Sequence, residues 1–118
     1  MNVFEYAARE EANWKANLEE MTDYKPMTTF FADFSIGEFV SGEEGIRDTY
    51  KRAFNSWKND IKYITEMCMV LNHKIWEWYG RKNYALSGVY DELWKKCAAY
   101  IESNFKGEDL SYYYRTID

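Results

Sequence analysis

The side chains that most often do chemistry in proteins are scarce in this sequence. His73 is the only histidine, and a metal ion bound by it would need cysteine or carboxylate ligands at matching positions. Glu77 follows one helical turn later and could hold a metal weakly with His73, whereas Cys68, five residues earlier, lies on another helical face. An exposed histidine beside a glutamate is far more common than a ligand pair. We therefore expect neither a metal site nor a cofactor.

Paired carboxylates, which could act as general acid and base, also stand at unsuitable spacings. Neighbouring positions on a helix point to different sides, so adjacent glutamates make poor acid–base dyads. The chain has no nucleophile elbow, P-loop or dinucleotide-binding glycine pattern. One histidine cannot supply the two Glu-x-x-His motifs of a ferritin-like metal site. We therefore expect no enzymatic activity. The adjacent pairs are Glu10 and Glu11, Glu19 and Glu20, and Glu43 and Glu44.

The two cysteines, Cys68 and Cys97, both fall on apolar helical stripes and are expected to be small buried hydrophobic residues. This usage favours a reduced, cytoplasmic protein. The first six residues lack the basic region and apolar stretch of a signal peptide. No apolar run approaches the roughly 18 residues that mark a membrane span, so no membrane partner is expected.

The overall charge argues against nucleic acid as a partner. The net charge is −5, whereas phosphate binding needs a concentrated positive surface. Residues 2–20 carry five acids against two bases, which indicates a solvated acidic face or, more rarely, a surface that mimics nucleic acid. Aromatic residues make up 19 % of the chain. They predict a core of large rings, with a partner-binding surface as the alternative.

The elements that must position these residues are helical. Between residues 43 and 80 the apolar positions recur every three or four residues, which is the α-helical period. We therefore predict one long central helix over 43–80, about 57 Å long. The weakest helix formers lie near Trp57–Asp60, where a kink is expected if the helix bends. The unbroken stripe is Ile46, Tyr50, Ala53, Trp57, Ile61, Ile64, Cys68, Leu71, Ile75 and Trp78.

Shorter elements are expected on both sides of the long helix. Residues 2–21 read as a helix that starts with a capping box at Asn2 and Glu5. Residues 27–40 are too apolar for a solvated loop, and they fit either an extended piece or a short helix. We favour an irregular aromatic lid with a short helix, packed on the long one. A further helix over 83–105 should run antiparallel to it, because the connection after Gly80 is short.

The C-terminal tail is too aromatic to be a frayed end. Gly107 fits a helix cap, and the residues from Glu108 to Asp118 include three consecutive tyrosines. We expect this tail to fold back on the bundle, with a tyrosine-presenting recognition segment as the alternative. The fold prediction is therefore a single all-α domain over 1–118, a three-helix bundle built on the long central helix.

Four segments of the chain are similar to segments of known protein sequences. With them the chain resembles a family of small proteins of unknown function found in gut bacteria and their phages or mobile elements. The resemblance implies an intracellular accessory protein and transfers no site residues. The segments are residues 27–31 (MTTFF), 48–54 (DTYKRAF), 71–74 (LNHK) and 107–116 (GEDLSYYYRT).

These patterns favour a non-enzymatic helical module for protein–protein interaction. Met69, His73 and Trp76 lie opposite the main apolar stripe, and an apolar surface there suits a partner. The tail tyrosines Tyr112, Tyr113 and Tyr114 are the second part of the predicted surface. One alternative is a structural homo-oligomer that pairs through the long helix. Another is an acidic inhibitor of a nucleic-acid-binding protein, which rests on the charge of the first helix.

Overall fold

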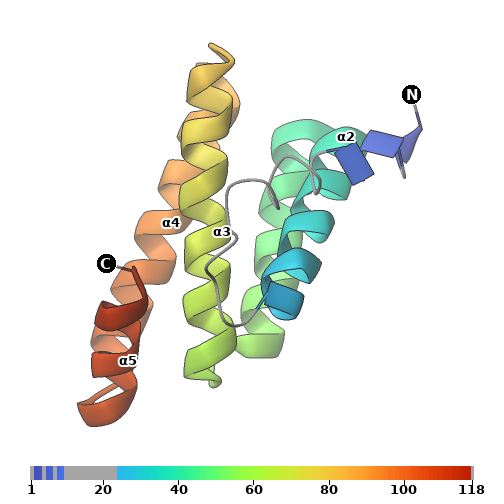
Figure 1. Cartoon of the computed structure of the whole chain (residues 1–118). Coiled ribbons are helices and arrows are strands. Elements are labelled where there is room, and N and C mark those ends of the chain that lie inside the picture. Colours follow the sequence, from blue (N-terminus) through green and yellow to red (C-terminus); the bar gives the residue numbers. More distant parts are fainter. Residues whose placement is uncertain (1, 4, 7, 10–23, 118) are drawn as a thin grey trace.

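The computed structural model describes residues 2, 3, 5, 6, 8, 9 and 24–117, and nearly all of them are helical (Figure 1). No strand occurs among these residues, and the predicted all-α class is confirmed. The four helices that can be bounded are α2 (Tyr24–Trp57), α3 (Ile61–Gly80), α4 (Tyr84–Asn104) and α5 (Gly107–Ile117).

The predicted single helix over 43–80 is wrong, because the chain turns at residues 58–60 between α2 and α3. Asp60 caps the new helix: its side chain accepts hydrogen bonds from the backbone N–H groups of Lys62 and Tyr63, at 3.0 and 3.2 Å. Ala53 and Ile64, on either side of the turn, both belong to the core. The apolar stripe therefore stays in phase although the helix does not continue. The alternative of a homo-oligomer assumed pairing through one unbroken helix over 43–80, and the structure has no such helix.

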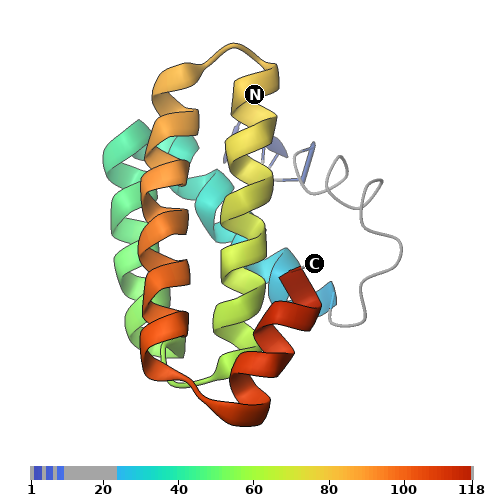
Figure 2. The ribbon, with the colours of Figure 1, turned by 90° about the vertical axis from the view of Figure 1, so that its left-hand side faces the viewer.

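Helix α2 is itself bent at Gly42, whose φ of 58° and ψ of −132° are non-helical. A glycine adopts such a conformation without the clash that a Cβ would cause. The bend folds α2 into two arms, residues 24–41 and 43–57, which overlap in Figure 1 and diverge from the bend in Figure 2. Residues 27–40 are therefore helical, and the favoured irregular lid is corrected to a full helical arm.

The arms of α2 touch through two glycines. A Cβ built on Gly45 would lie 2.0 Å from the carbonyl oxygen of Gly37. The hydroxyl of Thr49 donates to the carbonyl of Gly45 at 2.8 Å. Only residues without side chains permit this approach, so Gly37 and Gly45 set the distance between the arms.

The second half of the chain follows the prediction closely. Helix α4 begins at Tyr84, one residue after Asn83, whose side chain accepts from the N–H of Leu86 at 3.1 Å. It runs antiparallel to α3 (Figure 1). The tail folds back as expected, but it does so as helix α5, after a turn in which Gly107 has φ 60°.

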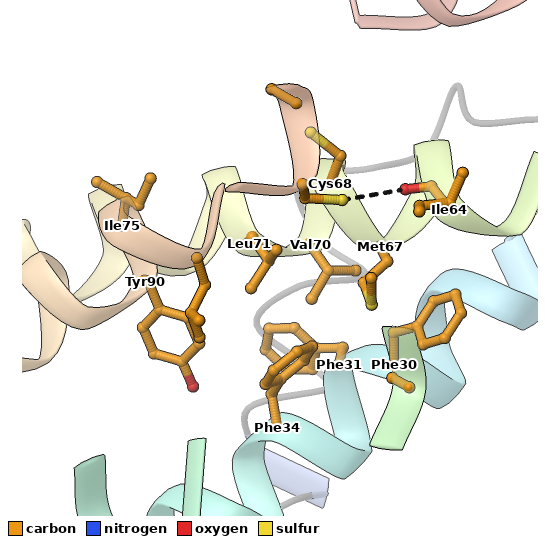
Figure 3. Packing of buried hydrophobic residues seen from close by; sticks show 14 of the residues in the cluster. Phe30, Phe31, Phe34, Ile64, Met67, Cys68, Val70, Leu71, Ile75 and Tyr90 are labelled. Atoms are coloured by element: carbon orange, nitrogen blue, oxygen red, sulfur yellow. Dashed lines mark hydrogen bonds between the residues drawn. The ribbon is translucent and has the colours of Figure 1, made fainter. Parts of the chain in front are cut away.

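Helix α3 is the central element, since α2, α4 and α5 all pack against it. The predicted helix over 2–21 is described only at its start, where the Asn2 side chain accepts from the N–H of Glu5, which is one half of the expected capping box; the Glu5 carboxylate accepts from the Asn2 side-chain amide and not from its backbone N–H. The remainder lies outside the described residues. Rings from α2 meet the aliphatic face of α3 in the core (Figure 3). The labelled core residues are Phe30, Phe31, Phe34, Ile64, Met67, Cys68, Val70, Leu71, Ile75 and Tyr90.

Candidate functional site

A groove of 330 Å³ lies between α3, α4 and α5. Figure 2 shows α5 beside the N-terminal half of α3. Cys68 lines the groove although it is fully buried, so it forms the floor. Trp76 is the most exposed of the lining residues named here, with 63 % of its surface accessible. The volume is at the small end of ligand pockets and suits one or two side chains of a partner. The other lining residues are Met69, Asn72, His73, Trp94 and Ile117.

Exposed aromatic rings continue from the groove toward the α3–α4 turn. Trp76 meets Tyr79 edge-on with ring centroids 5.8 Å apart, and Tyr79 meets Tyr84 in the same way at 5.4 Å. Tyr79 and Tyr84 are 54 % and 58 % exposed. We call these three residues the aromatic ladder. Such clusters of half-exposed Trp and Tyr are enriched where proteins bind each other.

His73 has a more defined environment than the predicted exposed histidine. Its ring is partly buried and lies edge-on to Phe31, with centroids 5.9 Å apart. Its Nε2 atom is 3.6 Å from Glu77, whose other carboxylate oxygen is 2.9 Å from Arg81. Among the described residues no group of three or more His, Cys, Asp or Glu side chains could hold a metal ion.

The structure gathers part of the predicted surface and disperses the rest. Met69, His73 and Trp76 line one groove, as the sequence predicted them to share a face. The tail tyrosines do not share one exposed surface. Tyr113 is buried with its hydroxyl 4.0 Å from Cys68 Sγ, whereas Tyr114 is exposed. Ile117 is the α5 residue that lines the groove.

Sequence reasoning missed several residues of this site. Trp94 follows the buried Leu93 on α4, and the size of its ring was the signal that could have identified it. Tyr79 and Tyr84 flank the predicted helix end, and their proximity depends on the hairpin turn. Ile117 carries no local signal, because its role depends on where α5 docks.

The positive charges near the ladder are another feature of this surface. The Arg81 guanidinium stands 4.9 Å from the ring centre of Trp78 while it pairs with Glu77. Lys82 is exposed and holds a positive φ of 62° in the α3–α4 turn. In a chain of net charge −5, this end of the hairpin therefore presents cationic groups beside exposed rings.

A polar cluster in the interior was not predicted. Lys74 is fully buried, and its ammonium contacts Glu38 and the hydroxyl of Ser35, each at 2.9 Å. The hydroxyl groups of Tyr6 and Tyr90 and the indole N–H of Trp78 all donate to the Glu38 carboxylate. A serine beside a lysine can form a nucleophile and base. Here both side chains are 0 % exposed and, unlike Cys68, neither lines the groove, so a substrate has no access to them, and the cluster serves packing.

No helix in the described part of the chain combines the length and the apolar character needed to cross a bilayer. Comparison with family models, curated protein sequences and solved structures finds no match to the chain. The resemblance to a family of small bacterial and phage proteins therefore stays a prediction.

Proposed function

We propose that the chain is a non-enzymatic module that binds a partner protein through the groove and the aromatic ladder. The observation that carries the proposal is the continuity of the two features: Trp76 belongs to both. A partner side chain would fill the groove against Trp94 and Met69, and neighbouring residues would cover the ladder. Burying exposed aromatic rings contributes most of the binding energy at such interfaces.

Charge favours a partner with acidic residues beside its apolar anchor. Lys82 is exposed beside the ladder, next to the Arg81–Glu77 ion pair, so an acidic residue of a partner would find complementary charge there. A second copy of the chain would instead bring a second Lys82 to a symmetric contact. We therefore expect a separate protein rather than self-association. Binding should weaken as the salt concentration rises, because exposed charges are screened.

The test places a photo-crosslinking residue at position 76 in the full chain inside cells, with a matched residue at position 40 as the control. Val40 is 68 % exposed and lies on α2. The protein captured only from position 76 is then purified. Trp76→Ala should weaken its binding at least tenfold, and Lys82→Glu should reduce both the affinity and its salt dependence. Equal binding by the wild type and Trp76→Ala would contradict the proposal.

Light scattering after gel filtration, over a range of protein concentrations, tests the alternative that the chain associates with itself. A monomer agrees with a foreign partner. A dimer that Trp76→Ala dissociates would replace the foreign partner with a second copy of this chain. The further alternative of an acidic inhibitor depends on glutamates 10, 11, 19 and 20, which lie outside the described residues.

A further inference from the structure

Two free thiols face each other across the α3–α4 interface. Cys68 on α3 and Cys97 on α4 are both fully buried. The Sγ atom of Cys97 lies 3.8 Å from the carbonyl oxygen of Ile64. In an α-helix that carbonyl accepts the backbone N–H of the residue four positions later, which is Cys68. Cys97 therefore lies against the helical turn that carries Cys68.

Polar side-chain groups from α4 and α5 converge on the Cys68 thiol. The thiol of Cys97 lowers the pKa of Cys68 most, against the opposing effect of burial, and the Tyr113 hydroxyl and the Trp94 indole lower it further. The same bond and burial raise the pKa of Cys97 well above its ordinary value. The two cysteines are therefore unequal: Cys68 is the more acidic thiol of the pair, and it is also the one that lines the groove.

The groove extends to this thiol, although the thiol itself is fully buried. A structural cysteine enclosed by apolar side chains is normally inert. Cys68 instead lines the groove, with Trp94 and Ile117 beside it. Helix α5 is the lid over this region, and Tyr113 is the one residue of α5 that is buried. Because Cys68 is fully buried, hydrogen peroxide would reach its thiol only when α5 opens locally.

We propose that Cys68 and Cys97 form a peroxide-reactive dithiol, in which Cys68 is oxidised first and Cys97 resolves it. The Cys68 thiolate attacks one oxygen of hydrogen peroxide, the O–O bond breaks, and hydroxide leaves as Cys68 becomes a sulfenic acid. The Cys97 sulfur then attacks the Cys68 sulfur. A disulfide forms, and the sulfenic oxygen leaves as water with the Cys97 proton. Two thiols are oxidised, and one peroxide is reduced to two waters. Cys68 lies in the same groove that the proposed partner would fill, but the reaction itself does not require that partner.

The first test uses the full reduced chain in native buffer. Hydrogen peroxide should remove two hydrogens from the intact mass, and proteolysis without reductant should yield a peptide pair joined through residues 68 and 97. Brief alkylation of the untreated wild type should label Cys68 at least ten times faster than Cys97. Proteolysis at Lys74 and Lys82 separates the two residues, so both rates come from one sample.

Single variants test the order of the two steps. Cys97→Ser should stop at the sulfenic acid, which a dimedone probe traps at residue 68, while Cys68→Ser should leave Cys97 unreacted under the same exposure. Should either variant fail to fold, the alkylation rates of the wild type still decide the assignment. The proposal is overturned when native wild type forms no internal disulfide, when the disulfide joins two chains, or when Cys97 is labelled as fast as Cys68.

Discussion

The carboxyl group of Glu66 is enclosed in the protein without full hydrogen bonding. The residue is 2 % exposed, and its Oε2 atom has no hydrogen-bond partner. Burial raises the pKa of Glu66 to about 7, Lys62 opposes this rise and Asp60 adds to it. Tyr112 on α5 also faces the group, since Glu66 contributes to the raised pKa of that tyrosine. Glu66 is therefore largely protonated in the folded state below pH 7.

Glu66 should make the protein less stable as the pH rises. The folded chain binds more protons than the unfolded chain between the ordinary pKa of 4.5 and about 7, so the free energy of unfolding falls across this window. Glu66→Gln keeps the shape and removes the charge. We expect it to stabilise the protein by about 1–3 kcal/mol at pH 8 and to have little effect at pH 4. Urea unfolding at both pH values measures this. A wild type with the same stability at both would contradict it.

The Lys74–Glu38 pair should behave unlike the ion pairs on the surface. Lys74→Met leaves the Glu38 carboxylate buried without its cation, which should cost about 3–5 kcal/mol of stability. The control is Lys95→Met, because the Lys95–Asp91 pair is 2.8 Å long and largely exposed. That change should cost less than about 1 kcal/mol. Equal losses in urea unfolding would show that the buried pair is not a specific stabilising contact. Position 74 looks polar and exposed in the sequence, and its burial depends on an acid 36 positions away.

At the scale of elements, the contact between the arms of α2 should tolerate no side chain. Gly45→Ala places a Cβ 2.0 Å from the Gly37 carbonyl oxygen. The arms must separate to accept it, with an expected loss of about 3 kcal/mol or more, comparable to overpacking a core. Gly88→Ala on α4 is the matched control, because its Cβ would meet nothing within 4 Å. It should stabilise α4 by up to about 1 kcal/mol. Thermal unfolding of the two variants compares them, and a tolerated Gly45→Ala would refute the close contact.

Some helices and turns are determined by their own residues, whereas others depend on contacts with distant segments. Helix α4 could be predicted because the stripe, the Asn83 cap and the glycine-bearing turn lie within the segment itself. The turn between α2 and α3 lies where a kink was expected, near Trp57–Asp60, but its severity was underestimated, because the stripe on both helices faces one core. Asp60 was the available sign, since its side chain caps α3. The bend at Gly42 depends on the fit of two arms, which no local pattern encodes.

At the scale of the whole molecule, some residues of the groove could be predicted from one helix, whereas others depend on how the helices pack. Met69, His73 and Trp76 were predictable together because they share one face of a single helix. Trp94 and Ile117 join them only after α4 and α5 have docked. The tyrosine tail could not be assigned from composition, because burial of Tyr113 and exposure of Tyr114 depend on how α5 rotates against α3.

Helix α5 connects the folding of the molecule to the reactivity of its thiols. The buried ring of Tyr113 anchors α5, and its hydroxyl separately lowers the pKa of the Cys68 thiol. Tyr113→Ala removes the anchor, so α5 should open more often and the alkylation rate of Cys68 should rise at least tenfold, in proportion to the population of the open state. Tyr113→Phe keeps the anchor and removes the hydroxyl 4.0 Å from the thiol. It should instead raise the pKa of Cys68 and slow alkylation near neutral pH.

The control for this comparison is Tyr114→Ala, because Tyr114 is 44 % exposed and lies on the same helix. Its alkylation rate should equal that of the wild type. Rates measured by mass spectrometry from pH 6 to pH 9 separate the two effects, since opening of α5 raises the rate at every pH whereas a changed thiol pKa shifts the profile along the pH axis. If Tyr113→Ala leaves the rate unchanged, α5 does not gate the groove floor, and peroxide must reach Cys68 from the side of Trp76.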